Sequence, residues 1–246
     1  MCRARFGIIN DMYNELLNEG VTDVAFMGIN GYNYINDSYS CMICDNPDGS
    51  AFLIENKKIK EVPCFEYLEE LEFEQVGILE AAVTSGGLST MPWTYEGKLK
   101  VLHNKTLRFP GHWDKMNAYR QLGLFSEKKI SFESKMISPR DFYHSMLEPQ
   151  IMVKNPKDIC IMRVKVIGKN KSKPIITTID IQEKYDSITG FLAMEKWTGW
   201  HASIMMIEIL NGNVNKGAIP IEKALTGSVF HNRSLLRDYD FKIDIK

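Results

Sequence analysis

Several side chains able to do chemistry fall close together between residues 77 and 125. Lys105, Thr106 and Arg108 end a segment of strand composition, and His112 follows a Pro-Gly turn. A guanidinium carries a fixed charge and can hold a carboxylate with two hydrogen bonds, whereas an imidazole can exchange a proton near neutral pH. Alternation along a strand places Thr106 and Arg108 on one face and Lys105 on the other. These residue types favour a small anionic or zwitterionic ligand, such as an amino acid.

A turn of small residues, Thr84-Ser85-Gly86-Gly87, precedes this group. Two adjacent glycines let the backbone approach a ligand closely, and successive N–H groups can hold an anion. A strand, a tight turn and a helix start would place polar groups at an edge that a ligand can reach. The turn is therefore a candidate part of the same binding site.

Each of these residues also has an ordinary structural explanation. Arg108 could form a surface ion pair, and His112 could cap a helix. A glycine pair is usually only a turn, and the tryptophans are more often part of a core or an interface than a platform for a ligand. The density of polar groups in one segment is what favours a functional site.

Hydrophobic periodicity predicts the elements that position these residues. Residues 98–109 have strand composition. Met116, Tyr119 and Leu122 recur at helical spacing, and Gly123 should end that helix. The sequence therefore predicts a strand, a turn and a helix in succession, with His112 at the helix start.

The rest of the chain mixes predicted helices and strands. The predicted elements are a helix at 6–17, a strand at 21–29 with a loop around Gly28 to Gly31, a short helix at 38–44, hairpins at 51–62 and 158–181, helices beginning at Ser138-Pro139 and near 191, a helical turn at 220–225 and an edge strand at 239–246. The helix near 191 runs to 210, with Thr198-Gly199 as a candidate break. This order indicates an α+β fold, a mixed sheet with flanking helices.

Composition narrows the function classes. The chain has 246 residues, 44% hydrophobic and 25% charged, with a formal net charge of -1. This balance gives no indication of a nucleic-acid partner, and no apolar run is long enough for a membrane span. Five cysteines without framework spacing favour a reducing cytoplasmic location, and Cys41 and Cys44 are better explained as thiols than as a metal site.

Two blocks of this sequence resemble the saccharopine dehydrogenase-like oxidoreductases. The first consists of EAAVTSGGLSTMP from Glu80, KTLRFPGH from Lys105 and LGLF from Leu122, and the second runs from Met194 to Leu225. Within the family, these blocks resemble the lysine 6-dehydrogenase branch, with carboxynorspermidine dehydrogenase nearby. The resemblance implies the C-terminal domain of the family, which binds substrate and forms the dimer.

The resemblance also implies a reaction and a set of residues. The family carries out NAD(P)-dependent oxidation at a C–N bond of an amino acid, or the reverse reduction. By this resemblance His112 is the candidate catalytic acid/base. The residues expected around a lysine-like or saccharopine-like substrate are Ser85, Gly86, Gly87, Lys105, Arg108 and Trp200. No residue is assigned to a metal or to the cofactor.

The sequence departs from the family pattern in one major respect. It contains no GxGxxG motif between a strand and a helix. We therefore expect one substrate-binding and dimerisation domain over residues 1–246, in which the segment from about 190 to 246 faces a missing nucleotide-binding domain. NAD or NADP would be bound by the complete enzyme and not by this chain alone. A Rossmann domain would be supplied in the same chain or by another.

Three functions remain open at this point. The chain could be the substrate side of an oxidoreductase, working as a homodimer with a nucleotide domain. It could be a non-catalytic binding or interaction protein derived from that domain. Less favoured is an enzyme of another kind that uses His112 without NAD.

Overall fold

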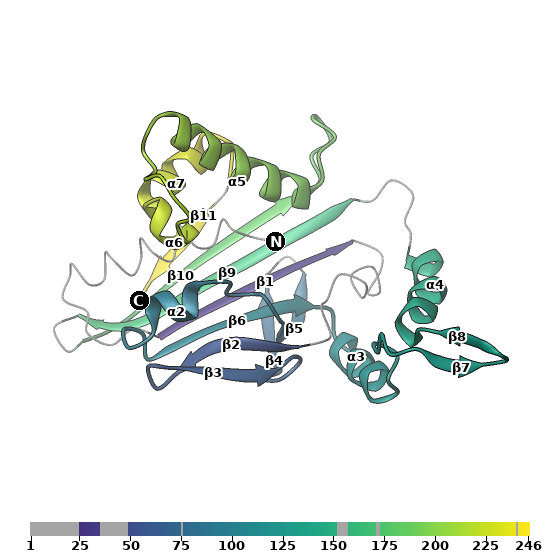
Figure 1. The fold of residues 1–246 in the computed structure, drawn as a ribbon. Coiled ribbons are helices and arrows are strands. Elements are labelled where there is room, and N and C mark those ends of the chain that lie inside the picture. Colours follow the sequence, from purple (N-terminus) through teal and green to yellow (C-terminus); the bar gives the residue numbers. More distant parts are fainter. Residues whose placement is uncertain (1–24, 35–48, 75, 152–156, 171–172, 240) are drawn as a thin grey trace.

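A mixed sheet of nine strands organises the chain, with the order β11-β10-β9-β1-β6-β2-β3 and with β4 and β5 attached through β6 (Figure 1). The computed structural model describes residues 25–34, 49–74, 76–151, 157–170, 173–239 and 241–246. The strands of this sheet are β1 (Ala25–Tyr34), β2 (Ser50–Glu55), β3 (Lys58–Pro63), β4 (Glu69–Phe73), β5 (Gly77–Val83), β6 (Val101–Arg108), β9 (Asp158–Asn170), β10 (Lys173–Lys184) and β11 (Phe241–Ile245).

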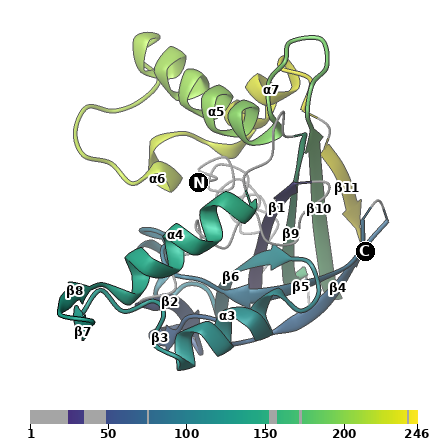
Figure 2. The same cartoon turned by 90° about the vertical axis from the view of Figure 1, so that its right-hand side faces the viewer.

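Helices gather in two separate groups around this sheet. Figures 1 and 2 show α5, α6 and α7 together and place α3 at a distance from α5 in both views. The described helices are α2 (Met91–Tyr95), α3 (His112–Gln121), α4 (Pro139–Ile151), α5 (Ala193–Leu210), α6 (Ile221–Ala224) and α7 (Gly227–Leu235), and a separate hairpin consists of β7 (Ile130–Phe132) and β8 (Lys135–Ile137). No described helix is long and apolar enough to cross a bilayer.

Strand β6 has two different neighbours along one edge. Its first residues pair with β2 in an antiparallel arrangement, and residues 105–108 pair with β5, also antiparallel. Its other edge pairs with β1 in parallel. The sheet therefore forks at β6, and the fork places residues 80–83 of β5 beside residues 105–108 of β6.

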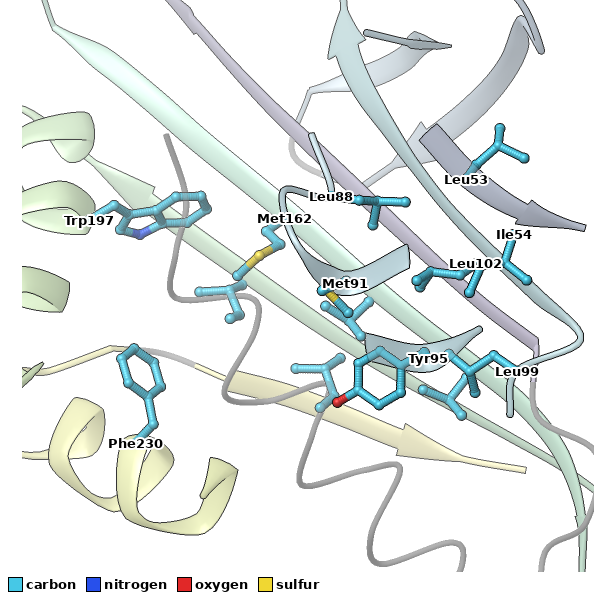
Figure 3. Packing of buried hydrophobic residues seen from close by; sticks show 14 of the residues in the cluster. Leu53, Ile54, Leu88, Met91, Tyr95, Leu99, Leu102, Met162, Trp197 and Phe230 are labelled. Atoms are coloured by element: carbon cyan, nitrogen blue, oxygen red, sulfur yellow. The ribbon is translucent and has the colours of Figure 1, made fainter. Parts of the chain in front are cut away.

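The largest core lies between the sheet and helices α2, α5 and α7 (Figure 3). Alternate residues of β9, among them Met162 and Val164, face this core, as the period of two in a strand requires. Trp197 of α5 and Phe230 of α7 are almost completely buried against them. A second cluster, with Trp113 and Met116, packs α3 onto β5.

A buried carboxylate from the sheet fixes the start of α5. Both oxygens of Asp158, the first residue of β9, accept N–H groups of the helix, from Ala193 at 2.7 Å and from Met194 at 2.9 Å. The first N–H groups of a helix have no partner within the helix, so this side chain satisfies two of them. The contact joins the strand and the helix that flank the main core.

Most predicted elements are confirmed. These include the strand at β6, the helix α3, the hairpins β2–β3 and β9–β10, the helical turn at α6, the edge strand β11, and α4, whose first residue is Pro139. Ser138 caps α4 by accepting the N–H of Asp141 at 3.3 Å. The α+β fold class with a mixed sheet is confirmed as well.

Two local predictions are wrong. The loop expected around Gly28 to Gly31 lies inside β1, because β9 and β6 pair with that strand on both edges and override the low strand propensity of glycine. The candidate break at Thr198-Gly199 is absent, and α5 continues through it. The predicted helices at 6–17 and 38–44 lie outside the described residues.

Candidate functional site

A row of buried polar side chains runs along one face of β6. Asn104, Thr106 and Arg108 are 5%, 2% and 2% exposed, and they alternate with residues that face the other side. A buried position on a central strand is normally apolar, because a polar group loses its hydration there. This row is therefore the feature of the sheet that most needs a functional explanation.

The turn at 84–87 lies directly against this row. The hydroxyl of Thr84 is 2.7 Å from that of Thr106, and both side chains are buried. A Cβ atom added at Gly87 would lie 2.0 Å from Nδ2 of Asn104, so only glycine fits there without a shift. Gly86 is glycine for another reason, since its φ of +72° is rarely adopted by other residues.

A small cleft with a volume of about 50 Å³ opens beside this turn. Its walls come from β2, the end of β5, the turn and β6. The lining residues that bear on the site are Thr84, Gly86, Gly87, Ser89 and Asn104. Sequence analysis predicted the glycines of this cleft, and Ser85 is the partly buried residue between them and Thr84.

Arg108 and His112 come together on Trp113. The guanidinium carbon of Arg108 lies 5.9 Å from the Trp113 ring centre, and the His112 ring lies 4.8 Å from it at 82°. One guanidinium nitrogen of Arg108 donates to the carbonyl of Leu107 at 2.8 Å. All three of these side chains are at most 2% exposed, so the cation and the imidazole share a dry environment.

Glu80 completes this group from the neighbouring strand. It lies opposite Arg108 in the β5–β6 pairing. One of its carboxylate oxygens accepts the N–H of Gly111 at 3.0 Å, and its carbonyl accepts the indole N–H of Trp113 at 3.2 Å. Gly111 precedes α3 with a φ of +84°, so Glu80 fixes the turn that delivers His112.

Two of the predicted substrate residues lie elsewhere. Lys105 faces the opposite side of the sheet, where its ammonium is 2.8 Å from the carboxylate of Glu69. Trp200 lies on α5 and packs its ring against Tyr239, with Lys196 over its face. Helix α5 is distant from α3 in both views (Figures 1 and 2). The structure thus places the turn at 84–87 against Asn104 and Thr106. It places Arg108 and His112 against Trp113, and it places Lys105 and Trp200 elsewhere.

A second polar cluster occupies the sheet face that Lys105 shares. Glu55 accepts hydrogen bonds from Lys60 at 2.7 Å and from Tyr67 at 2.6 Å, and these bonds lower the pKa of the Glu55 carboxyl. His103 lies 3.6 Å from the same carboxylate. Burial lowers the pKa of His103, although Glu55 opposes that shift. This cluster could not be predicted from the sequence, because three separate segments build it.

Asn104 and Glu80 are the site residues that sequence analysis missed. Asn104 could have been found from its spacing, because it lies two positions before Thr106 on the predicted strand. Glu80 could not, because its place depends on the pairing of β5 with β6. Among the described residues, no group of three or more His, Cys, Asp or Glu side chains could hold a metal ion. The Cys41 and Cys44 pair lies outside the described residues.

Known proteins similar to this chain share both its sequence pattern and its fold. Residues 44–233 match the model of the saccharopine dehydrogenase C-terminal domain. The structure is similar to that of the apo histidine-tagged saccharopine dehydrogenase (L-Glu forming) from Saccharomyces cerevisiae, with a TM-score of 0.71 and 13% sequence identity. That similarity covers 97% of this chain and 70% of the yeast chain. At this identity the structural likeness establishes the fold alone.

Proposed function

Because this chain belongs to the saccharopine dehydrogenase C-terminal domain family, we propose that it is the substrate-binding and catalytic portion of an NAD(P)-dependent oxidoreductase. The proposed reaction is oxidation, or the reverse reduction, at the C–N bond of an amino acid such as lysine or saccharopine. The observation that carries the proposal is the row of buried polar side chains on β6, together with the buried His112 at the start of α3. A fold alone would not require that row.

The proposed roles follow from the chemistry of each group. Arg108 would bind the substrate carboxylate, because a guanidinium offers two parallel N–H donors and stays charged when buried. The backbone of the turn at 84–87 would approach the same ligand beside Thr106. His112 would accept or donate the proton of the substrate nitrogen. It is the first residue of α3, and its ring is 2% exposed.

The described residues do not fit a dinucleotide. The glycine pair follows β5, but β5 and β6 are antiparallel, and the intervening helix α2 has only five residues. A pyrophosphate site of the Rossmann type needs parallel strands and a full helix after the glycines. We therefore assign neither the binding of the nucleotide nor any reaction step on it to the residues of this chain. A Rossmann domain, in the same chain or another, would supply the nucleotide, and the family resemblance suggests a homodimer.

Calorimetry with candidate amino acids tests the substrate site. Saturable binding of L-lysine, L-glutamate or saccharopine to the 246-residue chain is expected. Arg108→Lys keeps the charge but loses the paired donors, and a lost charge-assisted hydrogen bond of ~1.5–3 kcal/mol corresponds to a ~10–100-fold weaker affinity. Arg163→Lys is the matched control, because Arg163 lies on the sheet but pairs with Asp180 at 2.7 Å. Equal effects of the two substitutions would remove Arg108 from the site.

The alternative function is a non-catalytic binding or interaction protein derived from this domain. The absence of a GxGxxG motif from the sequence favours it. A fluorescence titration with NADH and NADPH, repeated with a separate Rossmann domain of the family, distinguishes the two functions. Substrate-dependent reduction of the nucleotide in the mixture supports the oxidoreductase. Amino-acid binding without turnover in any mixture supports the binding protein.

A further inference from the structure

The segment between β3 and β4, residues 64–67, is held in a strained conformation. Phe65 and Tyr67 have φ angles of +71° and +57°, in the left-handed region that aromatic residues rarely adopt. Such a conformation costs free energy, so the surrounding contacts must hold it in place. Phe65 makes its contacts beside the candidate site, whereas Tyr67 makes its contacts in the polar cluster around Glu55.

Phe65 connects this segment to both groups of the candidate site. Its backbone N–H donates to the carbonyl of Val83 at 2.7 Å, and Val83 immediately precedes the turn at 84–87. The N–H of Val83 donates in turn to the carbonyl of Glu66 at 3.0 Å. The buried Phe65 ring lies 5.3 Å from the ring of Trp113, on which the cation and the imidazole of the site meet. A displacement of Phe65 would therefore reach the turn and the Trp113 ring together.

Tyr67 holds the other end of the segment. Its hydroxyl donates to Oε1 of Glu55 at 2.6 Å and accepts a hydrogen bond from Lys60 at 2.9 Å. Its ring also packs edge-on against the His103 ring, at 5.2 Å and 67°. A hydrogen bond from a hydroxyl to a carboxylate is short and strong, so Glu55 stabilises Tyr67 in its strained conformation.

His103 is placed to compete with Tyr67 for the same carboxylate oxygen. Its Nε2 lies 3.6 Å from Oε1 of Glu55, is buried, and has no hydrogen-bond partner among the described residues. Both ring nitrogens of a protonated imidazole are donors. A proton on His103 would therefore add a positive charge and a second donor beside the oxygen that accepts the Tyr67 hydroxyl.

The groups that face His103 favour its neutral form near neutral pH. Burial lowers the pKa of His103 below 6.5, and Lys105 of β6 and Lys60 of β3 lower it further. Glu55 of β2 and Glu69 of β4 act in the opposite direction. Because the unfolded chain binds this proton more readily than the folded chain, the stability of the fold rises with pH through this range. The charged form of His103 is therefore confined to acid and strains its surroundings there.

We propose that Tyr67 is a positioning residue for the amino-acid site proposed above, on which this role depends, and that protonation of His103 releases it. While His103 is neutral, Tyr67 keeps the strained segment in place and Phe65 supports the candidate site. A charged His103 draws Glu55 toward itself, Tyr67 loses its acceptor, and the segment relaxes. The affinity for the amino acid then falls as the pH falls.

Calorimetry between about pH 5 and 8 tests this role, with whichever of L-lysine, L-glutamate and saccharopine binds most tightly. Tyr67→Phe keeps the ring but removes the hydroxyl, and its affinity at neutral pH should be about 3–30-fold weaker. His103→Gln cannot become charged, so it should lose a part of the pH dependence and leave only the part that His112 causes. In the Tyr67→Phe background, His103→Gln should change nothing further. His231→Gln is the matched control, because that ring packs on Phe241, and its pH profile should equal that of the wild type.

Nuclear magnetic resonance of the free chain tests the link without any ligand. The amide signals of Phe65 and Val83 should shift with the same midpoint as the His103 ring, and they should stop shifting in His103→Gln. Circular dichroism establishes that each variant is folded.

Three results would overturn the proposal: amides that do not follow His103, a pH profile that His103→Gln leaves unchanged, or a Tyr67→Phe affinity equal to that of the wild type. Amides that follow His103 in a chain that binds no amino acid would overturn the proposed function but support the link from His103 to the turn.

Discussion

The close approach of Gly87 to Asn104 leads to a quantitative prediction about the wall of the site. In Gly87→Ala the new Cβ would lie 2.0 Å from Nδ2 and 2.9 Å from Cγ of Asn104. Asn104 is only 5% exposed, so its side chain cannot swing freely into solvent. Overpacking of this kind costs ~1–3 kcal/mol of unfolding free energy, and the gain from a stiffer unfolded chain, ~0.4–1 kcal/mol, offsets only part of it.

A double-mutant cycle with Asn104→Ala isolates this clash. Truncation of Asn104 removes the two atoms in conflict and leaves its Cβ at 3.4 Å, an ordinary contact. Gly87→Ala should therefore destabilise the wild type by about 1–2 kcal/mol and the Asn104→Ala background by much less, which gives a coupling of ~1 kcal/mol or more. Urea unfolding followed by tryptophan fluorescence measures all four free energies.

Gly86→Ala is the matched control for this cycle. Nothing lies within 4 Å of a Cβ at that position, but its φ of +72° strains an alanine. The cost, ~1–2 kcal/mol from the left-handed backbone, should be the same with and without Asn104→Ala. If the cost of Gly87→Ala also stays the same in both backgrounds, the steric explanation of Gly87 is wrong.

Two further predictions concern buried carboxylates. Asp158→Ala should lower the unfolding free energy by ~1–2 kcal/mol, because α5 loses its cap. Amide hydrogen exchange should become faster at Ala193 first. Unchanged exchange at Ala193 would refute the capping role. The hydrogen bond from Asn213 and the ion pair with Arg233 lower the pKa of Glu208 in the folded protein below 4.5. The stabilisation of the fold by the Glu208 carboxylate is therefore complete above about pH 4.5 and is lost as the pH falls through this lowered pKa. The difference in Tm between wild type and Glu208→Gln should therefore shrink in acid, and a constant difference from neutral to acid pH would contradict this assignment.

Local signals were sufficient to predict much of the fold. The Ser138-Pro139 start of α4 and the valines and isoleucines of β9 act within a few residues, where propensity and capping decide the structure. Gly28 and Gly31 misled the prediction for β1, because pairing on both edges outweighs their local preference. The same limit applies to Gly199, an exposed residue in the middle of α5, whose other face packs on the main core.

Some residues of the candidate site could likewise be predicted from local sequence, and others could not. Arg108 and His112 could be predicted because one strand, one turn and one helix start position both of them. Glu80 could not, because its contact with Gly111 depends on how β5 pairs with β6, and residue types along the chain do not encode that register directly. Lys105 was expected near the substrate by resemblance. The alternation of side chains along the strand, however, already placed it on the face opposite Thr106 and Arg108, where it pairs with Glu69.

The fork of the sheet at β6 has a consequence for the order of folding. The hairpins β2–β3 and β4–β5 involve only neighbouring segments, so each can form early and then add to the same edge of β6. The parallel pairing on the opposite edge joins Ala25 to Val101 and must close a long loop first. A newly synthesised β1 therefore waits until β6 and β9 have left the ribosome before it can pair on both edges. β1 precedes the other strands of this sheet in the chain, yet it is among the last to complete its pairing.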